Sequence, residues 1–88
     1  MSDAPPSDAQ IAAALMAALR QRGAGKTICP SEVARALTPD WRPLMHDVRR
    51  IAQVLADSGD ITITQRGHPV AAPQARGPIR LGLPPSSD

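Results

Sequence analysis

The sequence has almost no aromatic residues. Among its 88 residues there is one tryptophan, Trp41, and there is neither tyrosine nor phenylalanine. Hydrophobic residues nevertheless make up 42% of the chain. A chain of this length forms one small domain, close to the lower limit at which a single hydrophobic core suffices. We therefore expect a core of leucine, isoleucine, valine, alanine and methionine, with Trp41 as its one large side chain.

Cysteines and long apolar segments are also scarce. Cys29 is the only cysteine, which excludes an internal disulfide, and a single thiol cannot form a metal site. The longest apolar run, residues 11–19, is too short and too rich in alanine to span a membrane. The acidic residues 1–8 lack the basic start of a signal peptide. The sequence thus predicts a cytoplasmic protein that is not membrane-bound.

Catalytic motifs are missing as well. The reactive candidates are several aspartates together with Cys29, Glu32, His46 and His68. None of them has the spacing of a nucleophile with its base, or of a zinc site. We expect no enzymatic activity, no metal and no cofactor. The remaining alternative is a redox-sensitive thiol at Cys29, just before a predicted helix whose amino terminus would favour a thiolate.

Charge is unevenly distributed along the chain. The formal net charge is only +2, but Asp3, Asp8 and Asp88 lie at the ends. Residues 9–87 therefore keep five of the eight acidic residues and all ten basic ones, nine of which are arginine. The planar guanidinium fork suits phosphates and guanine edges better than the lysine ammonium does. The excess favours a polyanionic partner.

The amino-terminal half predicts two helices with a short strand between them. A capping-box pattern at residues 7–10 precedes a predicted helix over residues 8–22, which has apolar residues at helical spacing. Residues 26–29 form a short β-prone stretch. Ser31 is the expected N-cap of a second helix, over residues 32–37.

The second half predicts a longer helix and a β-hairpin. Asp40 is expected to cap the third helix, which ends at about Ser58. Residues 60–65 alternate between isoleucine and polar residues, as a half-buried strand does. Residues 66–77 are rich in glycine, proline and alanine and predict a hairpin loop, the wing, and residues 78–83 contain the returning strand.

This order of elements is that of a winged helix-turn-helix: helix, short strand, helix, turn, helix and two-stranded wing. We predict a mainly helical fold with a small β-hairpin. Residues 8–83 form its single domain. Residues 1–7 and 84–88 are rich in proline and serine and are expected to be disordered tails.

A row of polar side chains follows one face of the third helix. Its members, at spacing i, i+4, i+7 and i+11, are Arg42, His46, Arg49 and Gln53, with Arg50 further round the helix. In a helix-turn-helix protein such a row enters the major groove, where arginine pairs with guanine and glutamine with adenine. The row predicts double-stranded DNA as the partner. The alternative is an ordinary solvated face whose charges form ion pairs along the helix.

The predicted wing adds three further basic residues, Arg66, Arg76 and Arg80. Beside a recognition helix they would contact the phosphate backbone and contribute affinity rather than sequence reading. Alternatively, these arginines only protect an exposed β edge from aggregation. The sequence contains no obvious dimerisation helix, although specific binding by so small a protein would call for a dimer or a larger partner.

A second hypothesis is a protein-interaction module that keeps the winged-helix frame without binding DNA. Met16, Val54 and residues 70–72 would then be its apolar contact points. The two hypotheses predict different surfaces. A DNA-binding protein should have one continuous positive face across the third helix and the wing, whereas an interaction module should have an apolar patch rimmed by charge.

Several short motifs resemble a family of short bacterial proteins of unknown function. They include Cys-Pro-Ser at 29–31, Val-Arg at 48–49, Thr-Gln-Arg-Gly at 64–67 and Gly-Pro-Ile-Arg at 77–80. The resemblance extends over about residues 9–83. It implies a winged-helix fold and brings no established activity, ligand or partner.

Overall fold

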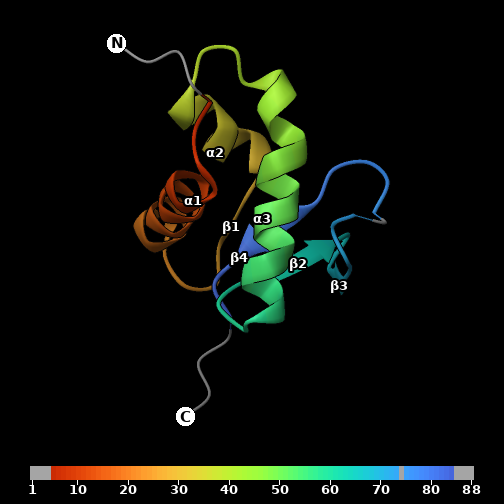
Figure 1. Cartoon of the computed structure of the whole chain (residues 1–88). Helices are drawn as coiled ribbons and strands as arrows, with labels where there is room; N and C mark the ends of the chain where they lie inside the picture. Colours follow the sequence, from red (N-terminus) through yellow and green to blue (C-terminus); the bar gives the residue numbers. More distant parts are fainter. Residues whose placement is uncertain (1–4, 74, 85–88) are drawn as a thin grey trace.

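Three helices and a small antiparallel sheet form the fold, as described by a computed structural model for residues 5–73 and 75–84 (Figure 1). The elements, in chain order, are α1 (Asp8–Arg22), β1 (Thr27–Ile28), α2 (Pro30–Leu37), the 3-10 helix η1 (Arg42–Leu44), α3 (Met45–Asp57), β2 (Thr62–Gln65), β3 (His68–Pro69) and β4 (Arg80–Gly82). This layout is compatible with a winged helix. Most residues of the two predicted tails lie outside the described residues.

The sheet has four strands, where the sequence predicted three: a short strand and a two-stranded wing. Their order is β1-β4-β2-β3, and all neighbours are antiparallel. The returning strand β4 therefore lies between β1 and β2. Gly82 makes this close packing feasible, because a Cβ atom there would lie 3.3 Å from side-chain atoms of both Thr27 and Thr62.

The additional strand β3 lies inside the segment that was predicted to be one open loop. Arg66 and Gly67 have φ angles of +53° and +84°, as in the tight turns that favour hairpins. They fold the chain back at once, so that His68 pairs with Gln65. Strand β3 ends at Pro69, which lies opposite Thr64 at a position where no N–H is needed, and the next residue, Val70, still donates its N–H to the Ile63 carbonyl at 3.1 Å.

Helix α1 matches its prediction, whereas α2 begins earlier than expected. The reciprocal hydrogen bonds of the Ser7–Gln10 capping box are present. The predicted N-cap of α2, Ser31, is wrong: the helix begins at Pro30 and its N-cap is Cys29. The carboxylate of Glu32 reaches back to accept from the Cys29 N–H at 2.8 Å. Proline fits the first helical position because its missing donor is not needed there.

The start of the third helix also differs from the prediction. Asp40 does not cap it; the Asp40 N–H instead donates to the Thr38 side chain at 3.3 Å. The chain first makes the 3-10 turn η1, whose N-cap is Trp41, and enters α3 at Met45. The helix ends at Asp57, one residue before the predicted end.

The core lies where the three helices pack on one another and on the sheet (Figure 1). It is aliphatic, as predicted. Its largest fully buried side chains are Ile11, Leu15, Leu19, Ile28, Ile79, Leu81, Val33 and Val48. Trp41 is only partly buried and packs at the edge of this cluster, so the core is built without a large central aromatic residue.

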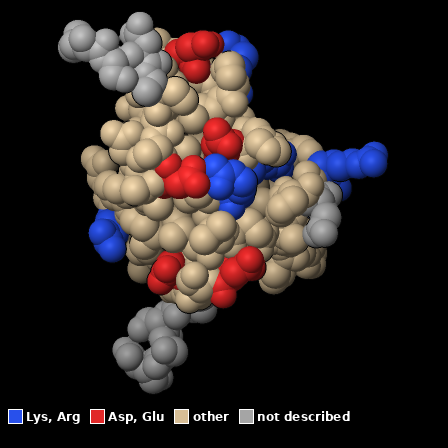
Figure 2. Space-filling view, in the orientation of Figure 1, with Lys and Arg blue, Asp and Glu red and all other residues tan. Residues whose placement is uncertain are grey.

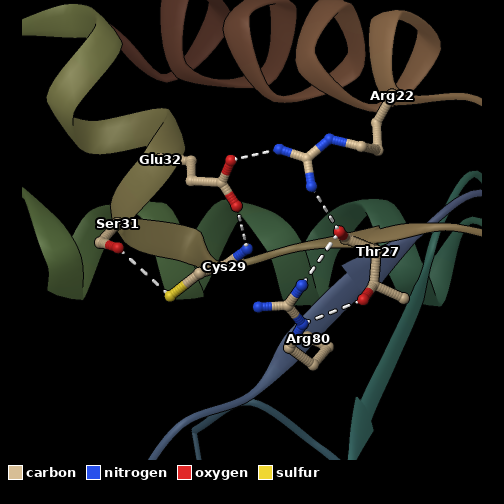
Figure 3. Close-up of polar contacts among 6 residues, drawn as sticks. All are labelled: Arg22, Thr27, Cys29, Ser31, Glu32 and Arg80. Carbon is tan, nitrogen blue, oxygen red and sulfur yellow. Dashed lines mark hydrogen bonds and ion pairs between the residues drawn. The ribbon is translucent and has the colours of Figure 1, made fainter.

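Two arginines and a glutamate join α1, α2 and β4 to strand β1 (Figure 3). Arg22 at the end of α1 pairs with Glu32 of α2 and donates to the Thr27 carbonyl at 3.2 Å. Arg80 of β4 donates to that same carbonyl at 3.1 Å and to the Thr27 hydroxyl at 2.9 Å. The hydrogen bond from the Cys29 N–H, followed by the contact with Arg22, lowers the pKa of Glu32.

The lowered pKa makes this network sensitive to acid. Ionised Glu32 stabilises the fold above its ordinary pKa of 4.5, and this contribution is lost as pH falls through the lower folded-state pKa. In urea titrations, Glu32→Gln should be less stable than the wild type at neutral pH, and the difference should shrink as the pH falls below 4.5. Asp60→Asn, at an exposed carboxylate, is the matched control. A difference that is independent of pH would contradict this role.

The valines of α3 provide a test of the core. Val48 is fully buried, whereas Val54 is 53% exposed on the same helix. Val48→Ala should lower the free energy of unfolding by about 2 kcal/mol, because a buried side chain leaves a void. Val54→Ala should change it by less than about 0.5 kcal/mol. Equal losses in chemical denaturation would show that the packing of α3 is described wrongly.

Candidate functional site

The polar row predicted on the third helix divides into two groups. Arg49 and Gln53 are partly buried and contact the backbone of residues 72, 75 and 77, in the loop that follows β3 in Figure 1. His46 and Arg50 are exposed. Arg42 lies in η1 rather than in α3. The structure thus does not bring the predicted row together as one continuous exposed surface.

Side chains from α3 and β2 hold the segment 75–78 by its carbonyl groups. Arg49 Nη2 donates to the carbonyl oxygens of Ala75 at 3.5 Å and Gly77 at 3.0 Å. The Gln65 amide donates to those of Arg76 and, at 3.1 Å, Pro78. The chain bends at Gly77, whose φ is +84°, so that donors from α3 and from β2 reach different carbonyls of the segment. These carbonyls have no strand partner, and the side chains supply their hydrogen bonds.

Gln53, one helical turn after Arg49, binds the wing at Ala72, a few residues before the segment 75–78. Its amide oxygen accepts from the Ala72 N–H at 2.7 Å, and its amide nitrogen donates to Asp57 at 2.8 Å. Both ends of this side chain are therefore occupied within the chain. Together with Arg49, it makes α3 the support on which the wing rests.

Arg50 is also paired within the chain. Its guanidinium group forms two hydrogen bonds to the Asp8 carboxylate, at 2.7 and 3.2 Å, and lies 3.3 Å from Asp47. The hydrogen bonds from Arg50 lower the pKa of Asp8. This contact ties the start of α1 to α3. The carboxylates of Asp8 and Asp47 therefore both lie beside the exposed guanidinium group of Arg50.

The face occupied by α3 accordingly has mixed charge. In Figure 2 acidic and basic side chains alternate across this face, and no continuous positive surface covers it. A groove of about 470 Å³ runs between α3 and the wing and is lined on the helix side by Arg50, Val54 and Asp57. Val54 lies there with 53% of its surface exposed, and it is the only large hydrophobic residue that is exposed among the described residues.

The three predicted wing arginines are placed differently from one another. Arg66, in the β2–β3 turn, and Arg76, on the segment held by Arg49 and Gln65, are both exposed. Neither forms an ion pair with a described residue. Arg80, in contrast, donates hydrogen bonds to Thr27 of β1 and so links strands β4 and β1.

Sequence reasoning missed two features near the α2–α3 turn and the wing. It gave no sign that the guanidinium groups of both Arg35 and Arg42 lie over the Trp41 ring, 4.5 and 4.6 Å from its centroid. It assigned no role to Gln65. One signal was available for Gln65: it lies in the Thr-Gln-Arg-Gly motif of the family that the sequence resembles, as Arg49 lies in the Val-Arg motif.

Comparison with known proteins identifies the family. Residues 8–84 match the family model described as "Protein of unknown function (DUF3253)", and the chain belongs to this family. It is a family of unknown function, as the sequence motifs indicated. No curated protein matches the chain. Within residues 5–73 and 75–84, no helix is both long enough and apolar enough to cross a membrane.

Removing the Arg49 side chain should release the wing. A hydrogen bond from a charged donor contributes about 1.5 kcal/mol, so opening of the segment around Arg76 should become about tenfold more frequent in Arg49→Ala. Limited trypsin digestion measures this as faster cleavage after Arg76. Arg50→Ala, which breaks the contact with Asp8 instead, is the control and should cleave there at the wild-type rate. An equal increase of the cleavage rate in both variants would mean that Arg49 does not stabilise the wing more than Arg50 does.

Proposed function

We propose that this chain is a winged-helix protein that binds duplex DNA through η1, the amino-terminal end of α3 and the wing, residues 66–77. One observation carries the proposal: Arg42, Arg66 and Arg76 are exposed and have no carboxylate partner among the described residues. Free guanidinium groups of this kind release counterions from DNA when they meet phosphates.

The layout of the fold supports this reading. Residues 38–44, which include η1, join helices α2 and α3, and the sheet places a basic hairpin beside α3, as in winged helix-turn-helix proteins that dock on DNA. The excess of basic residues between positions 9 and 87 provides the favourable long-range field. The chain would approach DNA with η1 and the first turn of α3, because Asp57 and Asp60 lie at the other end and Asp47, in that first turn, is paired with Arg50.

The proposal changes the roles of several predicted contact residues. Arg49 and Gln53 would position the wing instead of reading bases, since Arg49 Nη2 and both ends of the Gln53 amide already form hydrogen bonds within the chain. Arg80 would hold β1 and β4 together. Arg50 would contribute little while Asp8 and Asp47 neutralise it. His46 is exposed in the first turn of α3 and remains a candidate for base contact.

A second candidate function, the protein-interaction module, has one observation in its favour. The exposed Val54 borders the groove between α3 and the wing, with Ala72 and Pro73 on the opposite side. An apolar side chain with charged neighbours on both sides is the pattern of a small contact surface. This function would use the middle of α3, whereas DNA binding would use its beginning.

Fluorescence anisotropy of a labelled duplex, titrated at several salt concentrations, tests DNA binding. We expect a Kd between about 1 and 100 µM at moderate salt, weakening as salt increases. The double variant Arg66→Ala/Arg76→Ala should lower the slope of log Kd against log salt concentration by about 2, because two phosphate contacts are lost.

The matched control removes the same charge elsewhere. Arg20 and Lys26 are exposed on α1 and on the turn after it, so Arg20→Ala/Lys26→Ala should keep the wild-type salt slope. Absence of binding at low salt, where electrostatic association is strongest, would overturn the proposal in favour of the interaction module.

A further inference from the structure

Two arginines meet on the single aromatic residue of the chain. Arg35 from the end of α2 and Arg42 from η1 both lie over the ring of Trp41, with guanidinium carbons 4.5 and 4.6 Å from its centroid. The two carbons can therefore be no more than 9.1 Å apart, the sum of these distances. We call these three residues the Trp41 cluster.

The Trp41 cluster carries charge that the described residues do not compensate. The ion pairs of the described residues involve Arg22 and Arg50 only. Asp40, the nearest acid in sequence, forms no ion pair there, and both Arg35 and Arg42 are exposed. Two like charges within 9.1 Å of each other repel, and anionic groups that contact both guanidinium groups would relieve that repulsion.

The ring gives the two cations a fixed place. Tryptophan is the aromatic residue that attracts cations most strongly, and it does so through the face of its ring. The partly buried Trp41 is held at the edge of the core, so the arginines on it lose less freedom when they bind a ligand than isolated surface arginines would. Their planar forks can each donate two hydrogen bonds to phosphate oxygens.

We propose that the Trp41 cluster is a phosphate-binding site that takes backbone phosphates of duplex DNA. The inference rests on the proposed function and adds a phosphate contact between α2 and α3 to it. Arg42, which the sequence pattern placed against bases, would contact the backbone here. Both guanidinium groups are exposed, which suits an extended polyanion better than a small phosphate compound, whose tight binding needs enclosure.

The chain offers a direct probe of this site. Trp41 is its only aromatic residue, so intrinsic fluorescence reports on the Trp41 cluster alone. Titration of the full chain with an unlabelled duplex should change Trp41 emission over the same concentration range as the anisotropy change. The variant Arg35→Ala/Arg42→Ala should lower the salt slope by about 2, whereas Arg35→Lys/Arg42→Lys, which keeps both charges, should retain it. Circular dichroism checks that each variant is folded.

The outcomes separate this inference from the proposed function. If the wild type binds DNA and Arg35→Ala/Arg42→Ala has the same slope as Arg20→Ala/Lys26→Ala, the inference is overturned and DNA binding stands. If the wild type binds no DNA at low salt, both are overturned. A parallel titration with pyrophosphate distinguishes the source of the phosphate: saturable quenching by pyrophosphate at concentrations where DNA causes none would overturn the assignment to a nucleic-acid backbone.

Discussion

Four consecutive carbonyl groups with no strand partner set the main constraint on this fold. The segment 75–78 runs beside α3 and β2 without joining the sheet, and its backbone oxygens need donors. Arg49 and Gln65 provide them from either side. Because a single side chain bridges two carbonyls, each contact fixes two peptide units. The position of the wing, and with it the entry into β4, depends on these two residues.

This constraint explains why the most polar face of α3 is a poor candidate for direct base contact. The same amphipathic pattern describes a helix that exposes arginines to a ligand and one that uses them to dock its own loop. In this chain the two uses are divided along the helix. Arg49 and Gln53 support the wing, while the charges at the start of η1 and on the wing remain accessible.

Local features of the fold could be predicted from the sequence, and non-local ones could not. The limits of α1 follow from its capping box and its alanine-rich composition, which act within a few residues. The start of α2 was misplaced because Ser31 is a better N-cap by residue type than Cys29, while the deciding contact is the carboxylate of Glu32. The pairing of β1 with β4 joins residues more than fifty positions apart, and no local pattern encodes it.

The same distinction applies to the candidate site. The helical periodicity correctly separated apolar from polar faces, since burial of Val48 and exposure of His46 follow from spacing alone. The availability of each arginine depended on partners far along the chain. Arg49 meets a carbonyl 28 residues away, and Arg50 meets a carboxylate 42 residues away. Only the tertiary structure reveals which cations are already neutralised or committed.

The two edges of the sheet have a consequence for how the protein behaves in a crowded solution. Strand β1 has two residues and is followed within two positions by Pro30, and strand β3 has two residues and ends at Pro69. Neither edge offers a run of unpaired backbone donors long enough to recruit a strand from another molecule. The wing can therefore project from the domain without serving as a template for fibrils or for exchange of strands between copies.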